Sequence, residues 1–227
     1  MMPFLLIFTS DEKYYPKFWK CVRFLSFVLV YGMGFRLKIS KEQEIETNKS
    51  YMFCPNHTSF MDPFILAILS KNPIVFVGKK ELVKIPVFGF FYKRTVIMVD
   101  RSSKESRKRV FKMAKKRMQN GVSIVLFPEG LVPEEYIVLS PFKKGAFSLA
   151  IEHQIPIVPQ VYYDCKRLFS WNFLKGGPGT LRVKQHVFIE TKGLSSENIE
   201  NVLQQTFTII HNDLLNDKAY MKDTNRK

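Results

Sequence analysis

The chain has 227 residues, enough for one well-packed domain, and its 46% hydrophobic and 24% charged residues argue against bulk disorder. Its 35 Lys and Arg against 20 Asp and Glu give a net charge of +15, which favours a nucleic acid, an anionic membrane surface or a phosphorylated substrate as partner. The 21 phenylalanines favour the membrane, because apolar rings enter the lipid interface while basic side chains pair with headgroups.

The three cysteines, Cys21, Cys54 and Cys165, have neither metal-ligand spacing nor the even count of a disulfide framework. This pattern indicates a reducing compartment. A metal site and a structural disulfide are therefore not expected.

The N-terminal region, residues 1–45, is predicted to be a helical membrane-associating segment. Its apolar stretch at 18–35 has an uncharged part of 12 residues, 24–35, which is short of the roughly 20 residues that cross a bilayer. We therefore expect an amphipathic or half-immersed helix, with a plain packed helix and a full span as the alternatives. The basic residues expected at the headgroups are Lys13, Lys17, Lys20 and Arg23.

Residues 46–216 alternate short apolar strands with helices. Strands are predicted at 50–54, 74–77, 95–99, 122–127, 155–162 and 181–189. Helices are predicted at 63–70, from 79, and at 102–120, 144–152 and 196–215. This alternation predicts one α/β domain with a mixed, largely parallel sheet flanked by helices. The polar residues 217–227 are expected to form a frayed tail.

A histidine and an aspartate stand five positions apart in the run Asn56-His57-Thr58-Ser59-Phe60-Met61-Asp62, just before an apolar helix. Such a pair can act as a general base, because the carboxylate holds the imidazole in one tautomer while the other ring nitrogen takes a proton from a hydroxyl. If that hydroxyl belongs to the substrate, no serine or cysteine nucleophile is needed. The alternative is that Asp62 only caps the helix before Pro63.

Two further runs have residue types suited to binding a phosphorylated substrate. Gly78-Lys79-Lys80-Glu81-Leu82 is followed by Val99-Asp100-Arg101, and an arginine fork can grip phosphate oxygens. Phe127-Pro128-Glu129-Gly130 follows a predicted strand, at the end where α/β proteins bind ligands. Here Glu129 is suited to bind an acceptor hydroxyl or to orient basic groups, and Gly130 lets the backbone approach the substrate.

These blocks, with Ile155-Pro156-Ile157-Val158-Pro159 as the last, resemble in their order the motifs of the glycerolipid acyltransferase family, which carries a His-x4-Asp signature. The nearest family activity is that of 1-acylglycerol-3-phosphate acyltransferase. The resemblance implies transfer of an acyl chain from acyl-CoA or acyl-carrier protein to lysophosphatidic acid, giving phosphatidic acid. It also implies association with the cytoplasmic face of a membrane, peripheral or monotopic, through an N-terminal docking element.

The resemblance further assigns roles to residues at matching positions. His57 is expected to be the base, with Asp62 stabilising its imidazolium. The substrate-binding residues are expected to be Arg101, Lys79, Lys80, Glu129 and Gly130. No metal or tightly bound cofactor is required.

The chain departs from the family pattern after Gly130. Where Thr, Arg and Ser usually follow, it has Leu131, Val132 and Pro133, so that Arg101 and the lysines must supply more of the charge. Lys143 and Lys144 are candidates for a substitute. The alternative acceptors are glycerol-3-phosphate, another lysophospholipid and an aminolipid.

The predicted helix at 102–120 starts with capping-box spacing at Ser102 and Glu105. Residues 101–120 hold nine Lys and Arg against one Glu, and the apolar residues fall on one helical face. We interpret the basic side as a patch for anionic lipid or for an acidic acyl-carrier protein. No nucleic-acid motif accompanies it, so that nucleic acid is not expected, and a non-enzymatic basic binding protein is the other class considered.

Overall fold

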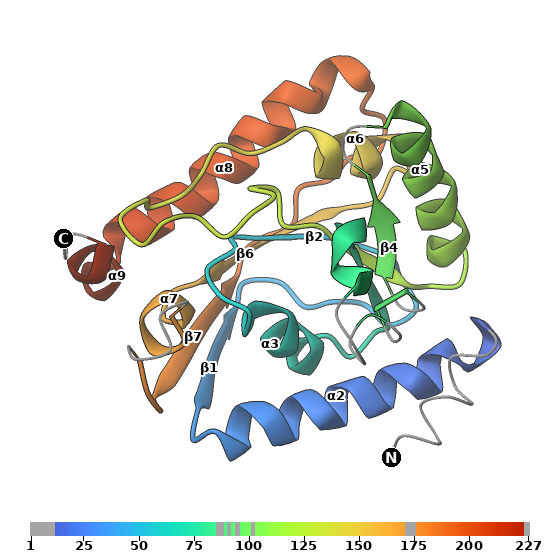
Figure 1. Ribbon diagram of the computed structural model, residues 1–227. Coiled ribbons are helices and arrows are strands. Elements are labelled where there is room, and N and C mark those ends of the chain that lie inside the picture. Colours follow the sequence, from blue (N-terminus) through green and yellow to red (C-terminus); the bar gives the residue numbers. More distant parts are fainter. Residues whose placement is uncertain are drawn as a thin grey trace.

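The computed structural model describes residues 12–84, 89, 92–93, 96–100, 103–170 and 176–224. In Figure 1 these residues form three layers, with a sheet between two sets of helices. Helices α2 (Tyr15–Gly32) and α3 (Asp62–Leu69) lie on one face. Helices α5 (Lys104–Met118), α6 (Gly145–Glu152) and α8 (Ile199–Asn216) cover the other.

The described residues contain a sheet of seven strands in the order β1-β7-β6-β2-β5-β3-β4. All neighbouring pairs are parallel except β6 and β7, which confirms the predicted largely parallel sheet. The strands are β1 (Arg36–Lys41), β2 (Met52–Pro55), β3 (Ile74–Lys79), β4 (Val96–Val99), β5 (Ser123–Val125), β6 (Ile157–Tyr162) and β7 (Thr180–Gln185).

The remaining helical segments are short. They are η1 (Glu12–Tyr14), η2 (Lys80–Lys84), α7 (Cys165–Leu168), η3 (Ser196–Asn198) and α9 (Lys218–Thr224). In the middle of the sheet, every residue of β2, β5 and β6 is buried. Helices cover both sides of these strands, and such strands read as continuous apolar runs, which is why the sequence locates them well.

The structure differs from the sequence prediction in several places. Residues 36–41, expected within a helical segment, form the edge strand β1, paired in parallel with β7. Residues 218–224, expected to fray, form α9, whose Tyr220 is buried. The cap of α5 is Ser103, whose hydroxyl accepts from the Ser106 amide, whereas the predicted cap Ser102 lies outside the described residues.

Helix α2 is held against α3 in antiparallel fashion. Near its start, the Trp19 indole N–H donates to the carbonyl oxygen of Ser70, just after α3, at 3.4 Å. Near its end, Val30 shares a buried apolar cluster with Met61 and Ile65 at the start of α3. The second half of α2 therefore lies beside the N-terminus of α3.

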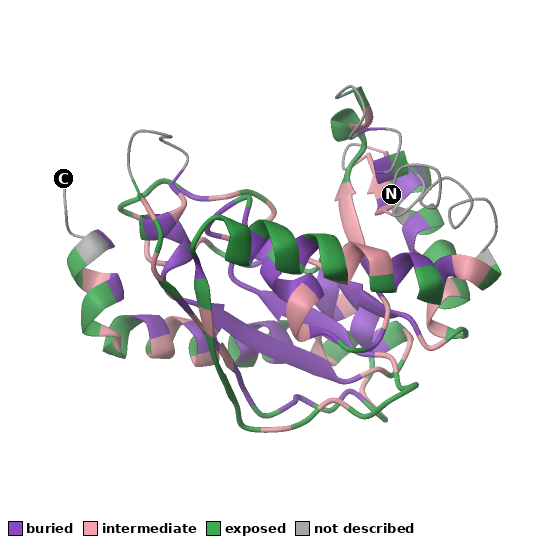
Figure 2. Ribbon diagram, turned by 90° about the horizontal axis from the view of Figure 1, so that it is seen from below, coloured by how far each residue is buried: buried purple, intermediate pink, exposed green. Residues whose placement is uncertain are grey.

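The outer side of that second half is apolar and exposed. Figure 2, which looks onto α2 from below, shows exposed residues along this helix. The large apolar side chains exposed here are Phe24, Leu25, Phe27, Val28, Leu29, Tyr31 and Met33. Within the described residues, every helix is too short or too polar to span a bilayer.

Candidate active site

The loop between β2 and α3 carries the His-x4-Asp pair. Strand β2 ends at Pro55 near the middle of the sheet, so that the loop begins at the carboxyl end of a central strand. The Asn56 side chain fixes the loop to β6, since its amide nitrogen donates to the carbonyl oxygen of Tyr162 at 3.1 Å and its oxygen accepts from the Tyr162 N–H at 2.8 Å. This end of a parallel sheet is where α/β proteins bind ligands.

The His57 imidazole contacts the Asp62 carboxylate directly. Nδ1 of His57 lies 2.9 Å from Oδ2 of Asp62. That oxygen also accepts from the main-chain N–H groups of Thr58 and Ser59, at 2.6 and 2.9 Å, and the carboxylate is fully buried. Asp62 is the first residue of α3, where the helix dipole favours a negative charge. The carboxylate is thus fixed in place, and Nε2 is the ring nitrogen that can take a proton.

The Phe127 ring packs against one face of the His57 imidazole. The rings of His57 and Phe127 are stacked, with centroids 4.0 Å apart and planes 20° apart. The His57 side chain keeps 20% of its surface exposed. An imidazole held by Asp62 at Nδ1 and by an aromatic ring on one face has little freedom to turn. Phe127 begins the run Phe127-Pro128-Glu129-Gly130 but was not among the predicted site residues.

Glu129 is buried and holds main-chain groups with both carboxylate oxygens. Oε1 accepts from the N–H of His57 at 2.7 Å, and Oε2 accepts from the N–H of Ser140 at 2.9 Å. Burial raises the pKa of Glu129 to about 7, although the two N–H donors oppose that rise. In the structure Glu129 therefore joins the His57 loop to the segment after Gly130.

Gly130 lies in a tight turn that only glycine adopts readily. Its φ is 77°, in the left-handed region, and its N–H donates to the carbonyl oxygen of Phe127 at 3.0 Å. The N–H of Lys143 donates to the carbonyl oxygen of Pro128 at 2.9 Å, which closes the loop of residues 128–143 at its base. The loop is thereby anchored next to His57.

Of the residues predicted to bind phosphate, the structure describes the lysines but not Arg101. Lys79 is exposed at the carboxyl end of β3. Lys80 forms an ion pair with Asp100, whose carboxylate raises the pKa of the Lys80 ammonium. Arg101 lies outside the described residues, and Lys144 pairs with Glu200 of α8 at 3.1 Å. The structure thus brings His57, Asp62 and Glu129 together, whereas Lys80 and Lys144 pair with other carboxylates.

Cys165 is a further neighbour of the pair that the sequence did not point to. Its thiol is fully buried at the start of α7. Burial raises the pKa of the Cys165 thiol well above its ordinary range, and the Asp62 carboxylate raises it further. Cys165 is therefore a neutral thiol beside the aspartate. Among the described residues, no three His, Cys, Asp or Glu side chains gather in a metal-binding group.

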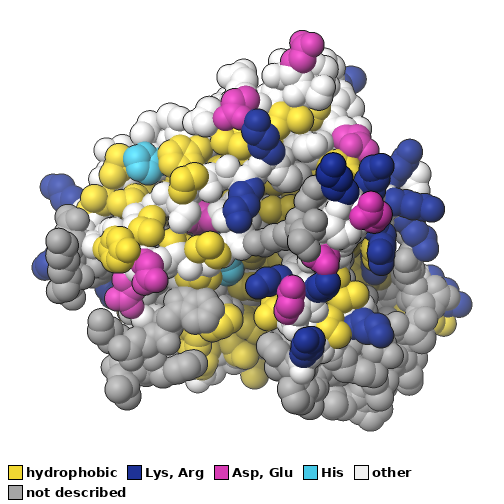
Figure 3. Space-filling view, turned by 45° about the horizontal axis from the view of Figure 1, so that its top comes forward, with side chains coloured by type: hydrophobic (Ala, Val, Ile, Leu, Met, Phe, Trp, Pro, Cys, Tyr) yellow, Lys and Arg dark blue, Asp and Glu magenta, His cyan; other side chains and the backbone are white. Residues whose placement is uncertain are grey.

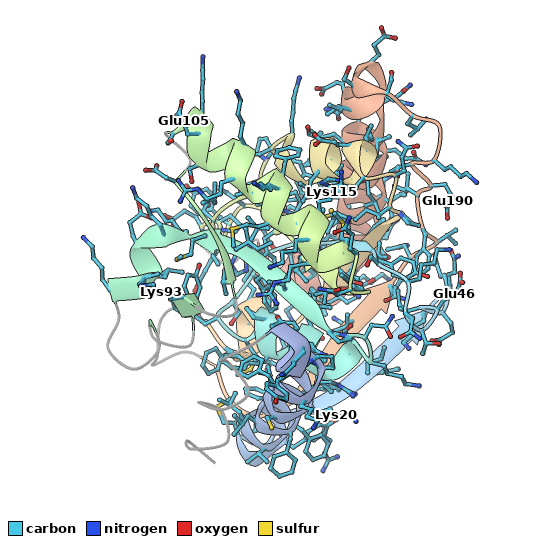
Figure 4. The ribbon with its side chains drawn as sticks, turned by 90° about the vertical axis from the view of Figure 1, so that its right-hand side faces the viewer. Lys20, Glu46, Lys93, Glu105, Lys115 and Glu190 are labelled. Carbon is cyan, nitrogen blue, oxygen red and sulfur yellow. The ribbon has the colours of Figure 1, made fainter. Side chains whose placement is uncertain are left out.

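The basic side of α5 is exposed. Its outward-facing cations are Lys104, Lys108, Arg109, Lys112, Lys115 and Lys116. Figure 3 shows Lys and Arg side chains gathered on one side of the molecule, and in Figure 4 Lys115 of α5 and Lys20 of α2 lie in different parts of the view. The basic helix and the apolar side of α2 are thus separate surface features.

Comparison with known proteins places the chain in a family. Residues 36–163 match the family model described as Acyltransferase. An uncharacterized acyltransferase of Schizosaccharomyces pombe is 33% identical over 84% of this chain and 69% of its own length. The 1-acyl-sn-glycerol-3-phosphate acyltransferase of Saccharomyces cerevisiae is 29% identical over 80% of this chain, and the human beta enzyme 28% over 74%. The matches span 60% and 61% of those two relatives.

A solved structure has the same fold. The 1-acyl-sn-glycerophosphate acyltransferase PlsC of Thermotoga maritima superposes with a TM-score of 0.75, covering 93% of this chain and 86% of that one at 21% identity. The matched region contains His57, Asp62 and Glu129, the three residues that the structure brings together. The chain belongs to the acyltransferase family and is an enzyme similar to the 1-acyl-sn-glycerol-3-phosphate acyltransferases.

Proposed function

We propose that this chain transfers a fatty acyl group from an acyl thioester to the free hydroxyl of lysophosphatidic acid, giving phosphatidic acid. Nε2 of His57 takes the hydroxyl proton as the oxygen attacks the thioester carbonyl. The C–S bond then breaks, and the thiolate leaves with the proton returned by the imidazolium. The donor is acyl-CoA or acyl-carrier protein.

The observation that carries this proposal is the contact between Nδ1 of His57 and Oδ2 of Asp62 at 2.9 Å. Because Nδ1 contacts a buried carboxylate, the imidazole presents Nε2 to the substrate. When Nε2 takes a proton, the negative charge of Asp62 stabilises the positive imidazolium. The named activities of the yeast and human relatives support lysophosphatidic acid as acceptor.

The position of α2 supports delivery of a lipid substrate. The apolar second half of this helix lies beside the N-terminus of α3, which carries Asp62. Two more large apolar side chains at that end, Phe60 and Phe64, are 52% and 37% exposed. We take this surface as the part of the protein that meets the membrane, with the acyl chains entering from it.

Basic residues next to that surface fit an anionic membrane. Lys17 and Lys20, on the first half of α2, are exposed. Apolar aromatics with flanking cations are the composition of an interfacial helix that lies in the plane of the bilayer surface. We therefore propose peripheral attachment at the cytoplasmic face of a membrane, through α2.

A second group of acceptors is favoured by one specific feature. The apolar residues Leu131, Val132 and Pro133 stand in the anchored loop 128–143, and Leu131 is 54% exposed. A loop without an arginine there offers less charge to an acceptor phosphate. Another lysophospholipid, glycerol-3-phosphate or an aminolipid is therefore the alternative acceptor.

The decisive experiment follows release of free thiol from acyl-CoA by purified protein in liposomes, with and without lysophosphatidic acid. We expect release that depends on the acceptor and is lost in His57→Ala. His211→Ala is the matched control, because His211 of α8 also stacks on a phenylalanine, with ring centroids 5.2 Å apart. If His57→Ala keeps most of the activity, the assignment of the base is wrong.

The same assay with other acceptors and with acyl-carrier protein as donor separates the remaining possibilities. Faster transfer to another acceptor would identify the alternative substrate. If no acceptor supports thiol release with either donor, the protein is a basic membrane-binding protein without this activity.

A further inference from the structure

Two side chains beyond the matched family region hold the loop of residues 128–143. The ammonium of Lys166, on α7, donates to the carbonyl oxygen of Ile137 at 2.6 Å. The hydroxyl of Tyr220, on α9, donates to the next carbonyl oxygen, that of Val138, at 2.7 Å. The Lys166 ammonium also lies 5.5 Å from the centroid of the Tyr220 ring, so that the two side chains support each other.

These contacts lead directly to the catalytic histidine. Ser140 lies two positions after Val138 and donates its N–H to Glu129. The other carboxylate oxygen of Glu129 accepts from the N–H of His57. A displacement of the loop at Val138 would therefore move Ser140, and through Glu129 the main chain of His57.

Tyr220 is itself fixed by a network on β7. Its N–H donates to Oδ1 of Asp217 at 2.8 Å, and the other oxygen of Asp217 accepts from Arg182 at 2.6 Å. The Tyr220 side chain is 2% exposed. The tyrosine hydroxyl is thus held in position by the sheet, which makes it a rigid support for the loop.

The stability of the fold does not explain why residue 166 has a charged side chain. Its side chain is buried, and burial lowers the pKa of the ammonium to about 8, although the carboxylates of Glu129 and Glu135 attract it. Keeping a cation in such a place works against folding, and an apolar chain of similar length would fill the same space. What the ammonium adds is a strong hydrogen bond to Ile137 together with its contact with the Tyr220 ring.

We propose that Lys166 and Tyr220 are positioning residues for His57, acting through the loop and Glu129. They keep Ser140 on Glu129, and Glu129 in turn fixes the main chain at the catalytic base. This role rests on the acyl transfer proposed above, because the position of His57 affects a rate only if His57 is the base.

The first test measures kcat, KM and thermal unfolding for Lys166→Met and Tyr220→Phe. We expect kcat to fall at least roughly tenfold in each, the scale of one lost buried hydrogen bond to a fixed partner, with KM for the donor near the wild-type value. Thr191→Val is the matched control. It removes a buried hydroxyl that donates to the carbonyl oxygen of Ile155 at 2.8 Å, away from this loop, and should leave kcat unchanged.

A second measurement does not depend on activity. Hydrogen–deuterium exchange should speed up in peptides covering 56–60 and 137–143 in both variants, because the N–H groups of His57 and Ser140 lose their fixed acceptor. Exchange in Thr191→Val should match the wild type in these peptides. If wild-type protein shows no acyl transfer, the proposed function fails, while the exchange result still decides whether the loop is coupled to His57.

The pH profile separates positioning from a plain stabilising role. As the pH rises through about 8, Lys166 loses its proton, so that the ratio of wild-type kcat to that of Lys166→Met should fall. Lys166→Arg keeps its charge, and its kcat should lie between those of the wild type and of Lys166→Met. Over the same range the contribution of Lys166 to folding stability becomes more favourable, because the unfolded chain binds more protons than the folded one. Activity and stability should thus change in opposite directions.

Two results would overturn the proposal. One is exchange that speeds up only within α7 and α9, which would leave His57 uncoupled. The other is exchange that speeds up at His57 with kcat unchanged in an active enzyme, which would make the contacts purely structural.

Discussion

The main-chain N–H of His57 donates to Oε1 of Glu129 at 2.7 Å, across 72 positions of sequence. Two motifs that are far apart in the chain are therefore joined through a buried carboxylate. The Asp62 carboxylate holds the ring of His57, and Glu129 holds its backbone. In the proposed mechanism, a histidine fixed at both places would start each turnover in the geometry that proton transfer needs.

Replacing Asp62 by asparagine should remove the charge that stabilises the imidazolium while largely keeping the shape. We expect kcat to fall by at least about 100-fold, with KM changed little, because the interaction matters most in the transition state. Steady-state thiol release measures both. Asp213→Asn is the control, since Asp213 also pairs with a histidine, His186, at 2.8 Å but away from the loop. Equal losses in the two variants would argue against a special role for Asp62.

Phe127→Leu should loosen the imidazole of His57, the proposed base, without emptying the space beneath it. Stacked ring pairs contribute about 0.5–1.5 kcal/mol beyond their burial, so that we expect kcat to fall roughly 2- to 12-fold. Phe207→Leu, which removes the ring under His211, should leave kcat at the wild-type level. A kcat unaffected in Phe127→Leu would show that Asp62 alone orients His57.

Glu129→Gln tests the buried carboxylate by its dependence on pH. Because burial raises the pKa of Glu129 to about 7, the folded protein holds this proton more tightly than the unfolded chain does. Wild-type stability should therefore decrease, relative to the glutamine variant, as the pH rises from about 4.5 to 7, and level off above. Urea unfolding at several pH values measures this difference.

The activity of the same variant should change in the other direction. Above pH 7 the ionised carboxylate can accept from both His57 and Ser140, whereas a glutamine offers one acceptor and turns an NH2 group toward the second donor. We expect a kcat at least roughly tenfold lower at pH 8, from the lost hydrogen bond to a charged acceptor. A variant as active as the wild type at pH 8 would remove Glu129 from the site.

Phe27→Glu should weaken attachment to anionic liposomes. Phe27 is 51% exposed on α2, and burying a side chain of this size in lipid is favourable by about 2 kcal/mol, so that binding should fall at least roughly tenfold. Leu215→Glu is the control, because Leu215 of α8 is 44% exposed on a different helix. Sedimentation with liposomes measures binding, and equal behaviour of the two variants would contradict docking through α2.

The sequence predicted the central strands and the main helices because their signals are local. Strand β2 has every residue buried, and such continuous apolar runs are easy to recognise. The edge strand β1 was missed because its burial is slight and its sequence, Arg-Leu-Lys-Ile-Ser-Lys, is half basic. It is a strand because β7 offers its main chain at the sheet edge, a partner that no local pattern reveals.

The contacts within the candidate site could be predicted in part for the same reason. His57 and Asp62 are five positions apart, so that spacing alone suggests their pairing. The partners of Glu129 are N–H groups of the main chain, which every residue but proline carries and no motif can single out. Helix α9 was expected to fray because its residues are polar, yet Arg182 holds its first turn through Asp217. Such long-range contacts decide structure without leaving a local pattern.

The pairing of β1 with β7 also sets the order in which the sheet can be completed. Arg36 is in register with Thr180, so that β1, the first of the described strands in the chain, waits for β7, the last of them, before it gains a neighbour. Until then the backbone of β1 stays unpaired, while the apolar outer side of α2 is exposed both before and after the sheet is complete. Nascent chains should accordingly need either a chaperone or a surface that shields these residues while synthesis continues.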